Sequence, residues 1–100
     1  MLGAPGPRTI SFAVGGPIDR ADLPALCERV SSLLAGSGAA VALCDVSGAR
    51  DDAMTVEALA RMQLAARRST CQMRLRGAST ELLGLLAFMG LRDVLPPSEG

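Results

Sequence analysis

The feature that most constrains the fold is an apolar run over residues 39–46, which contains Asp45 near its end and is followed by Ser47-Gly48. A short run that is apolar on both faces is typical of a central strand with helices on both sides of its sheet. The acidic pair Asp51-Asp52 then opens a segment with helical periodicity. The sequence therefore predicts a strand, a loop and a helix start at the rim of a sheet, where open α/β sheets usually bind ligands and partners.

Strands and helices are predicted to alternate along the chain. Strands are expected over residues 8–14, 39–46 and 71–75, and each is followed by a segment with helical periodicity. The connections are long enough for neighbouring strands to run parallel. We therefore expect an α/β fold: a single domain with a small, mostly parallel or mixed sheet and alternating helices packed on it.

Residues that cap helices mark the expected helix boundaries. Asp19 or Asp22 is the predicted cap of the first helix, and Asp52 caps a helix over residues 53–68. Ser79 caps a last helix that reaches Met89, and Gly90 is placed for a left-handed stop after which Leu91 folds back. The first helix carries one apolar stripe, made of Leu23, Leu26, Cys27, Val30, Leu33 and Leu34.

Composition limits the location and the partners of the protein. Residues 1–7 are predicted to be a flexible leader, residues 8–96 the folded domain and residues 97–100 a flexible tail. Ten arginines balance ten acidic residues, so no net charge attracts nucleic acid. No apolar run approaches the roughly 20 residues that span a bilayer. The three cysteines are interpreted as buried thiols in a reducing compartment, which predicts a cytoplasmic protein without membrane insertion.

The chain lacks the side chains that most enzymes use as bases. It contains no His, Lys or Tyr, so none of the hydroxyls of Ser47, Thr55 and Ser79 has a side chain of these types to activate it. The carboxylates of Asp45, Asp51 and Asp52 are interpreted as two helix-capping acids and one strand-terminal acid rather than as a metal site. We expect no enzymatic activity, no metal and no cofactor.

The second predicted helix carries a candidate binding surface. Glu57, Arg61, Leu64 and Arg68 fall within about 60° of one another around the helix axis. Leu64 is thus an apolar side chain in a charged stripe. It is either an ordinary exposed leucine or an anchor for a partner. The residues predicted to bind a partner are Asp51, Asp52, Ala53, Met54, Thr55, Glu57, Ala58, Arg61 and Leu64.

The last predicted helix is apolar around its whole circumference. Residues 79–89 contain one charged residue and six large apolar ones, which indicates burial on more than one side. In so small a domain, one of these sides is expected either to meet another chain or to pack under the C-terminal segment. We predict a homodimer, formed through this helix or through an unpaired edge of the sheet.

Taken in order, these features resemble a STAS domain of the anti-sigma factor antagonist-like family. The resemblance rests on Gly16-Pro17-Ile18-Asp19, on Asp45-Val46-Ser47-Gly48 with the acidic loop after it, and on residues 89–96, Met-Gly-Leu-Arg-Asp-Val-Leu-Pro. It covers about residues 8–96. One departure is that the chain has room for a single strand before its first helix, where the family commonly has two.

The resemblance implies a bacterial signalling protein that regulates transcription by binding an ATP-dependent anti-sigma kinase through the loop and helix after the central strand. In the family, phosphorylation of a Ser or Thr at that helix start breaks the contact. Ala53 stands at the phosphoacceptor position, and Thr55 is the nearest hydroxyl, a weak candidate. The resemblance leaves two alternatives open: a subunit that docks on the ATPase of an ABC-type lipid transporter, and a small-molecule or nucleotide sensor that binds at the sheet rim.

Overall fold

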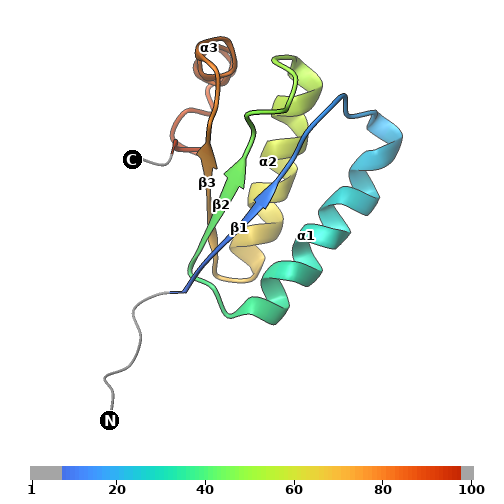
Figure 1. Ribbon diagram of the computed structural model, residues 1–100, viewed down its shortest axis with the longest axis vertical. Helices are drawn as coiled ribbons and strands as arrows, with labels where there is room; N and C mark the ends of the chain where they lie inside the picture. The colour runs from blue at the N-terminus through green and yellow to red at the C-terminus, as the bar shows by residue number, and fades with distance from the viewer. Residues whose placement is uncertain (1–7, 98–100) are drawn as a thin grey trace.

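A computed structural model describes residues 8–97 and shows three parallel strands and three α-helices in alternation (Figure 1). In chain order these are β1 (Thr9–Ala13), a 3-10 turn η1 (Arg20–Asp22), α1 (Leu23–Ser37), β2 (Val41–Asp45), α2 (Ala53–Arg68), β3 (Gln72–Arg76) and α3 (Thr80–Phe88). The α/β fold and the order of its elements are confirmed. The predicted leader and residues 98–100 of the predicted tail lie outside the described residues.

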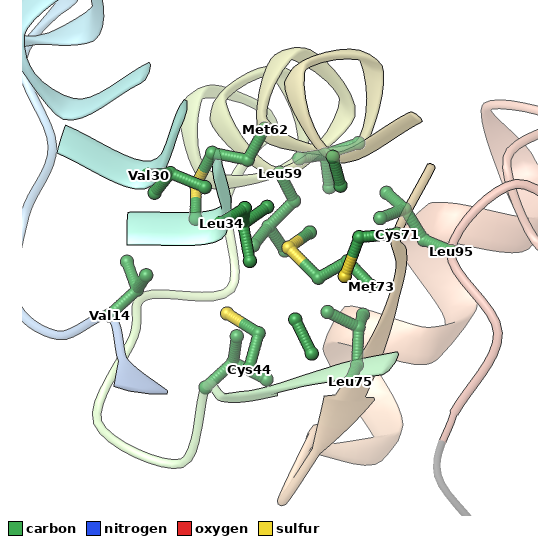
Figure 2. Packing of buried hydrophobic residues seen from close by; sticks show 14 of the residues in the cluster. Val14, Val30, Leu34, Cys44, Leu59, Met62, Cys71, Met73, Leu75 and Leu95 are labelled. Carbon is green, nitrogen blue, oxygen red and sulfur yellow. The ribbon is translucent and has the colours of Figure 1, made fainter. Parts of the chain in front are cut away.

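The sheet has the order β1-β2-β3, with β2 in the centre. Its register places Phe12 beside Cys44 and Cys44 beside Leu75, so these three side chains share one face of the sheet. Helices α1 and α2 lie next to each other and supply Leu34 and Leu59 to the core on this face (Figure 2). Because consecutive parallel strands are joined by helices on the same side, one apolar core serves the whole domain.

The central strand is buried on one face only, which corrects the prediction that both its faces are covered. Ala42 and Cys44 are fully buried, whereas Val41 and Leu43 on the opposite face are only partly buried. The physical reason is that α1 and α2 both pack on the same face of the sheet. Within residues 8–97, no helix fully covers the apolar residues on the other face of β2.

The first helix also differs from expectation in one residue of its apolar stripe. Leu23, Val30 and Leu34 are buried, but Leu33 is 46% exposed because it lies toward the outer side of the open strand β1. The helix ends at Gly38, whose φ of 67° is a left-handed conformation that glycine adopts without a steric penalty.

The segment after α3 closes the other edge of the sheet. Gly90 has a φ of 75°, and the N–H of Leu91 donates to the carbonyl of Leu86 over 2.8 Å, so the chain folds back as predicted. Leu95 is fully buried, and the N–H of Leu75 donates to the carbonyl of Pro96 over 3.0 Å. Pro97, which the sequence assigns to the tail, forms an isolated bridge with Leu75 in β3.

Candidate functional site

The loop between β2 and α2 is held in shape by Asp45. Its carboxylate accepts hydrogen bonds from the backbone N–H of Ser47 over 2.9 Å and from the Ser47 hydroxyl over 2.7 Å. The backbone bond is the main reason that the pKa of Asp45 lies below its usual value. Gly77, with a φ of 72°, comes so close that an added Cβ would lie 3.0 Å from the Cβ of Ser47. The loops after β2 and β3 therefore pack against each other at the rim of the sheet.

The acidic pair after this loop stabilises helix starts. Asp52 is the N-cap of α2, and its carboxylate accepts the backbone N–H of Thr55 over 2.9 Å, which lowers the pKa of Asp52. The carboxylate of Asp51 accepts the hydroxyl of Ser79 over 2.6 Å, and the same hydroxyl accepts the N–H of Leu82 at the start of α3. Asp51 thus connects the loop to the next helix. Within residues 8–97 no three acidic or thiol side chains gather as a metal site would require.

At the start of α2, an alanine faces solvent and the nearest hydroxyl, that of Thr55, is buried. Ala53 is exposed and Met54 is partly exposed, whereas the Thr55 side chain is fully buried. The hydroxyl of Thr55 is therefore shielded from solvent in this structure. Thr55 was also predicted to contact a partner, and its burial rules out direct contact in this conformation. The exposed start of α2 is made of Asp51, Ala53 and Met54.

The charged stripe of α2 is organised around Glu57. Its two carboxylate oxygens accept hydrogen bonds from Arg20 over 2.9 and 3.2 Å, and Arg61 lies 3.0 Å from one of them. The hydrogen bond from Arg20 is the main cause of the lowered pKa of Glu57. Arg20 is not among the site residues that the sequence predicts. In a parallel sheet, α1 and α2 both run back against the strands, so their starts lie at the same end of the domain, and this topology could have indicated the pair.

Leu64 projects from the same stripe, and Ala58 does not. Leu64 is 57% exposed, whereas Ala58 is fully buried against the core. Ala58 is therefore a correction to the predicted contact residues: it lies one residue from Glu57, a 100° turn toward the core. Its contribution to any partner contact is limited to packing α2 in place.

Leu64 stands beside an open groove between α1 and α2. The groove has a volume of about 510 Å³ and was not anticipated, because it needs the side-by-side packing of two helices far apart in sequence. Apolar side chains and two arginines of α2 meet there. It is lined by Leu23, Pro24, Cys27, Glu28, Ser31, Arg61, Leu64, Ala65 and Arg68.

The two buried cysteines, Cys44 and Cys71, offer little nucleophilic character. All three cysteines are free thiols. Burial, with a smaller contribution from the neighbouring charge of Asp45, raises the pKa of the Cys44 thiol to about 12, and burial also raises the pKa of Cys71. A protonated buried thiol is a poor nucleophile, so these residues act as core side chains.

The described helices are too short or too polar to cross a bilayer: none within residues 8–97 has a long enough apolar stretch. This finding concerns helices only. The candidate site consists of the loop between β2 and α2, the start of α2, the charge network around Glu57, and the exposed Leu64 beside a groove. Such an arrangement can bind a protein surface, and it lacks an activated nucleophile.

Comparison with known families gives a match over nearly the whole chain. A family model described as "Mlab, STAS domain" matches residues 7–96. The match starts just before β1 and ends within the segment that closes the edge of β3. A comparison with curated proteins found no match.

Proposed function

Because this chain belongs to the STAS domain family, whose members are generally non-catalytic interaction modules, we propose that it is a protein-docking module of the anti-sigma factor antagonist type, without a phosphorylation switch. Its partner is an anti-sigma factor or a kinase-like protein. The docking face comprises the exposed residues of the α2 start and stripe. These are Asp51, Ala53, Met54, Glu57, Arg61 and Leu64. The three free thiols fit a reducing, cytoplasmic environment.

The observation that carries this proposal is the setting of Leu64. It is 57% exposed and lies one turn beyond Arg61, which Glu57 and Arg20 help to hold in position. Arginine is enriched at interface centres, where side chains lose their contact with water on binding, so the part of Leu64 that is exposed beside Arg61 would be buried there. An ordered charge network beside such an anchor loses less side-chain entropy on binding than free side chains would.

Ala53 and Thr55 support the proposed absence of a switch. Ala53 has no hydroxyl, and the Thr55 side chain is fully buried. A phosphate added near Asp51 and Asp52 would also meet like charge. We therefore expect binding that persists when ATP and a kinase are present, measured as unchanged affinity after incubation with both.

A decisive test compares two leucines that carry the same substitution. Leu64→Asp places a charge in the docking face, whereas Leu33→Asp places one on α1, where Leu33 is 46% exposed and outside that face. In affinity capture followed by mass spectrometry, the wild type and Leu33→Asp should retain the same ATP-binding protein, and Leu64→Asp should lose it. Ala53→Asp should behave like Leu64→Asp.

Calorimetry with the purified partner then measures the loss. We expect at least a 100-fold weaker affinity for Leu64→Asp, because a hot-spot truncation costs about 2 kcal/mol or more and a buried charge adds to it. Circular dichroism shows whether the fold is intact. Equal affinities for Leu64→Asp and Leu33→Asp would rule out this face.

A second candidate partner is the ATPase of an ABC-type lipid transporter. Ala53 and Thr55 favour this partner too. Ala53 has no hydroxyl to phosphorylate and Thr55 is buried, and a contact that phosphorylation does not break suits a permanently assembled subunit. The Val94-Leu95-Pro96 ending, which packs along β3 through Leu95 and Pro96, also resembles that group. The identity of the captured protein separates the two: a transporter ATPase supports this candidate, and an anti-sigma kinase supports the first.

A further inference from the structure

The sequence predicts self-association through the last helix or through an unpaired edge of the sheet. Helix α3 buries Leu82 and Leu86 in the core, but Phe88 is 88% exposed. The prediction that this helix is buried on more than one side is therefore not met within residues 8–97. The exposed side of α3 does not specify what covers it, whereas the main chain of an open edge strand specifies another strand.

Strand β1 is an edge strand with free main-chain groups. It pairs with β2 alone, whereas the opposite edge of the sheet, at β3, is closed by the segment after α3 (Figure 1). Arg8 and Val14 bond β2 through their main chains, and the alternate residues between them do the same. The N–H and C=O groups of Thr9, Ser11 and Ala13 therefore point away from the sheet, and none of the described residues pairs with them.

Strand β1 also lacks the features that usually protect an exposed edge from pairing. Its five residues, Thr9–Ala13, include no charge and no proline, and their one-to-one register with β2 contains no bulge. On the face covered by the helices, Ile10 and Phe12 are only partly buried at the margin of the core. A strand added to this edge would therefore gain both main-chain hydrogen bonds and apolar contacts.

The strand is complementary to itself when two copies run antiparallel about Ser11. In that register Ser11 faces Ser11 of the other copy and Thr9 faces the other copy's Ala13, so the outward N–H and C=O groups of all three residues pair. Ile10 then lies directly opposite Phe12 of the other copy, on the face covered by the helices. This is a non-hydrogen-bonded pair, in which side chains come closest, and pairs of aromatic and β-branched residues are favourable there.

The charged groups near the ends of β1 do not oppose this register. Arg8 of one copy comes level with Val14 of the other, and Val14 shares a hollow with Asp22 and Arg29, which carry opposite charges. The guanidinium of Arg8 is also held within its own copy, because it donates to the carbonyl of Ser37 over 3.0 Å at the end of α1. The register therefore brings no uncompensated like charges together.

We propose that this chain forms a homodimer in which β1 pairs antiparallel with β1 of a second copy, centred on Ser11, so that the two sheets become one. A two-fold axis perpendicular to the sheet repeats each contact, as in isologous dimers. Both copies of α1 then lie on the same face, where Leu33, 46% exposed beside β1, turns toward the other copy. The edge of β1 is separate from the docking face of α2, so either proposal can fail alone.

The first test measures the molar mass of the full chain over a wide concentration range. Sedimentation equilibrium of the 10.3 kDa chain should give twice the monomer mass at micromolar concentration. Ser11→Pro removes an N–H that faces solvent in the monomer, a position at which an edge strand tolerates proline. It should weaken the dimer at least about 10-fold, because both central hydrogen bonds are lost.

A charge at the same position gives a second variant with a matched control. Ser11→Lys should weaken the dimer about 5-fold or more, because it places two like charges directly opposite each other. Gln72→Lys adds the same charge at an exposed position on the same face of the sheet, but on β3, and should remain dimeric. Circular dichroism on every variant establishes that the fold persists.

Cysteine cross-linking tests the antiparallel register itself. Opposite residues of a hydrogen-bonded antiparallel pair have Cα atoms about 5.5 Å apart, within reach of a disulfide, so Ser11→Cys should give a covalent dimer under mild oxidation. Thr9→Cys should not, because the two Thr9 positions lie about 13 Å apart along the strands, whereas Thr9→Cys combined with Ala13→Cys should cross-link. The wild type, with its three free cysteines, gives the background.

Three results would overturn the proposal. They are a monomer throughout the concentration range, a dimer that neither Ser11→Pro nor Ser11→Lys weakens, and cross-linking of Thr9→Cys that equals that of Ser11→Cys.

Discussion

Gln63 shows how a single residue can connect three parts of the chain. Its side chain is fully buried on α2, and its amide oxygen accepts the backbone N–H of Met73 over 2.9 Å. Its amide nitrogen donates to the carbonyl of Met73 over 2.9 Å and to that of Val94 over 2.6 Å. The side chain thereby joins α2 to β3 and to the segment after α3. Nothing in the sequence distinguishes this glutamine from an exposed one.

Replacing Gln63 should be costly because its partners would stay buried. Gln63→Leu leaves two carbonyls and one N–H without these bonds, and each buried unpaired group costs about 1–3 kcal/mol. We expect the free energy of unfolding to fall by roughly 3 kcal/mol or more in urea titrations. Gln72→Leu, at an exposed position of β3, is the control and should change it little. A small loss for Gln63→Leu would show that water takes over the three bonds.

At the scale of an element, the start of α2 depends on the charge of Asp52. The hydrogen bond from Thr55 lowers the pKa of Asp52 in the folded state relative to the unfolded chain. A lowered pKa contributes stability that is present above the unfolded value near pH 4 and is lost as the pH falls through the folded value. Acid should therefore weaken this helix start.

A comparison with Asp52→Asn isolates this effect. Asparagine still caps a helix but does not titrate in this range. The stability advantage of the wild type over Asp52→Asn should be largest above about pH 5 and should shrink as the pH falls below about 4. Urea unfolding at a series of pH values measures it. A difference that stays constant over that range would mean that the charge of Asp52 adds nothing to the cap.

For the molecule as a whole, a three-stranded sheet holds together because its edge at β3 is closed by residues from the end of the chain. Leu95 is fully buried in the same core as Leu75 and Leu82, and Pro96 accepts a hydrogen bond from β3. The segment after α3 is therefore part of the folded unit. The domain couples α2, β3 and α3 through it.

Truncating Leu95 should consequently destabilise the whole domain. Leu95→Ala removes a fully buried side chain, and such changes cost about 2–5 kcal/mol. We expect a single cooperative unfolding transition at lower urea concentration, with no separate loss of α3. The neighbouring, partly exposed Val94 provides the control, because Val94→Ala should cost clearly less. A two-step transition would show that the C-terminal part unfolds on its own.

Local sequence patterns determined the order of elements and most helix ends. The run over residues 39–46, the periodicity of residues 53–68, and the caps Asp52 and Ser79 act over a few neighbouring residues, so they can be read without the fold. Within the candidate site, the exposure of Leu64 and of Arg61 followed from the same helical periodicity.

Which surfaces are covered depends on how the helices pack against the sheet and against each other. Four features depend on where α1 packs against α2. They are the one-sided burial of β2, the burial of Thr55 and Ala58, the pairing of Arg20 with Glu57, and the groove beside Leu64. These contacts join residues far apart in the chain, and periodicity carries no information about such distances. For the same reason, the sequence does not show which side of α3 is exposed. The structure shows it, because Leu82 and Leu86 are buried in the core.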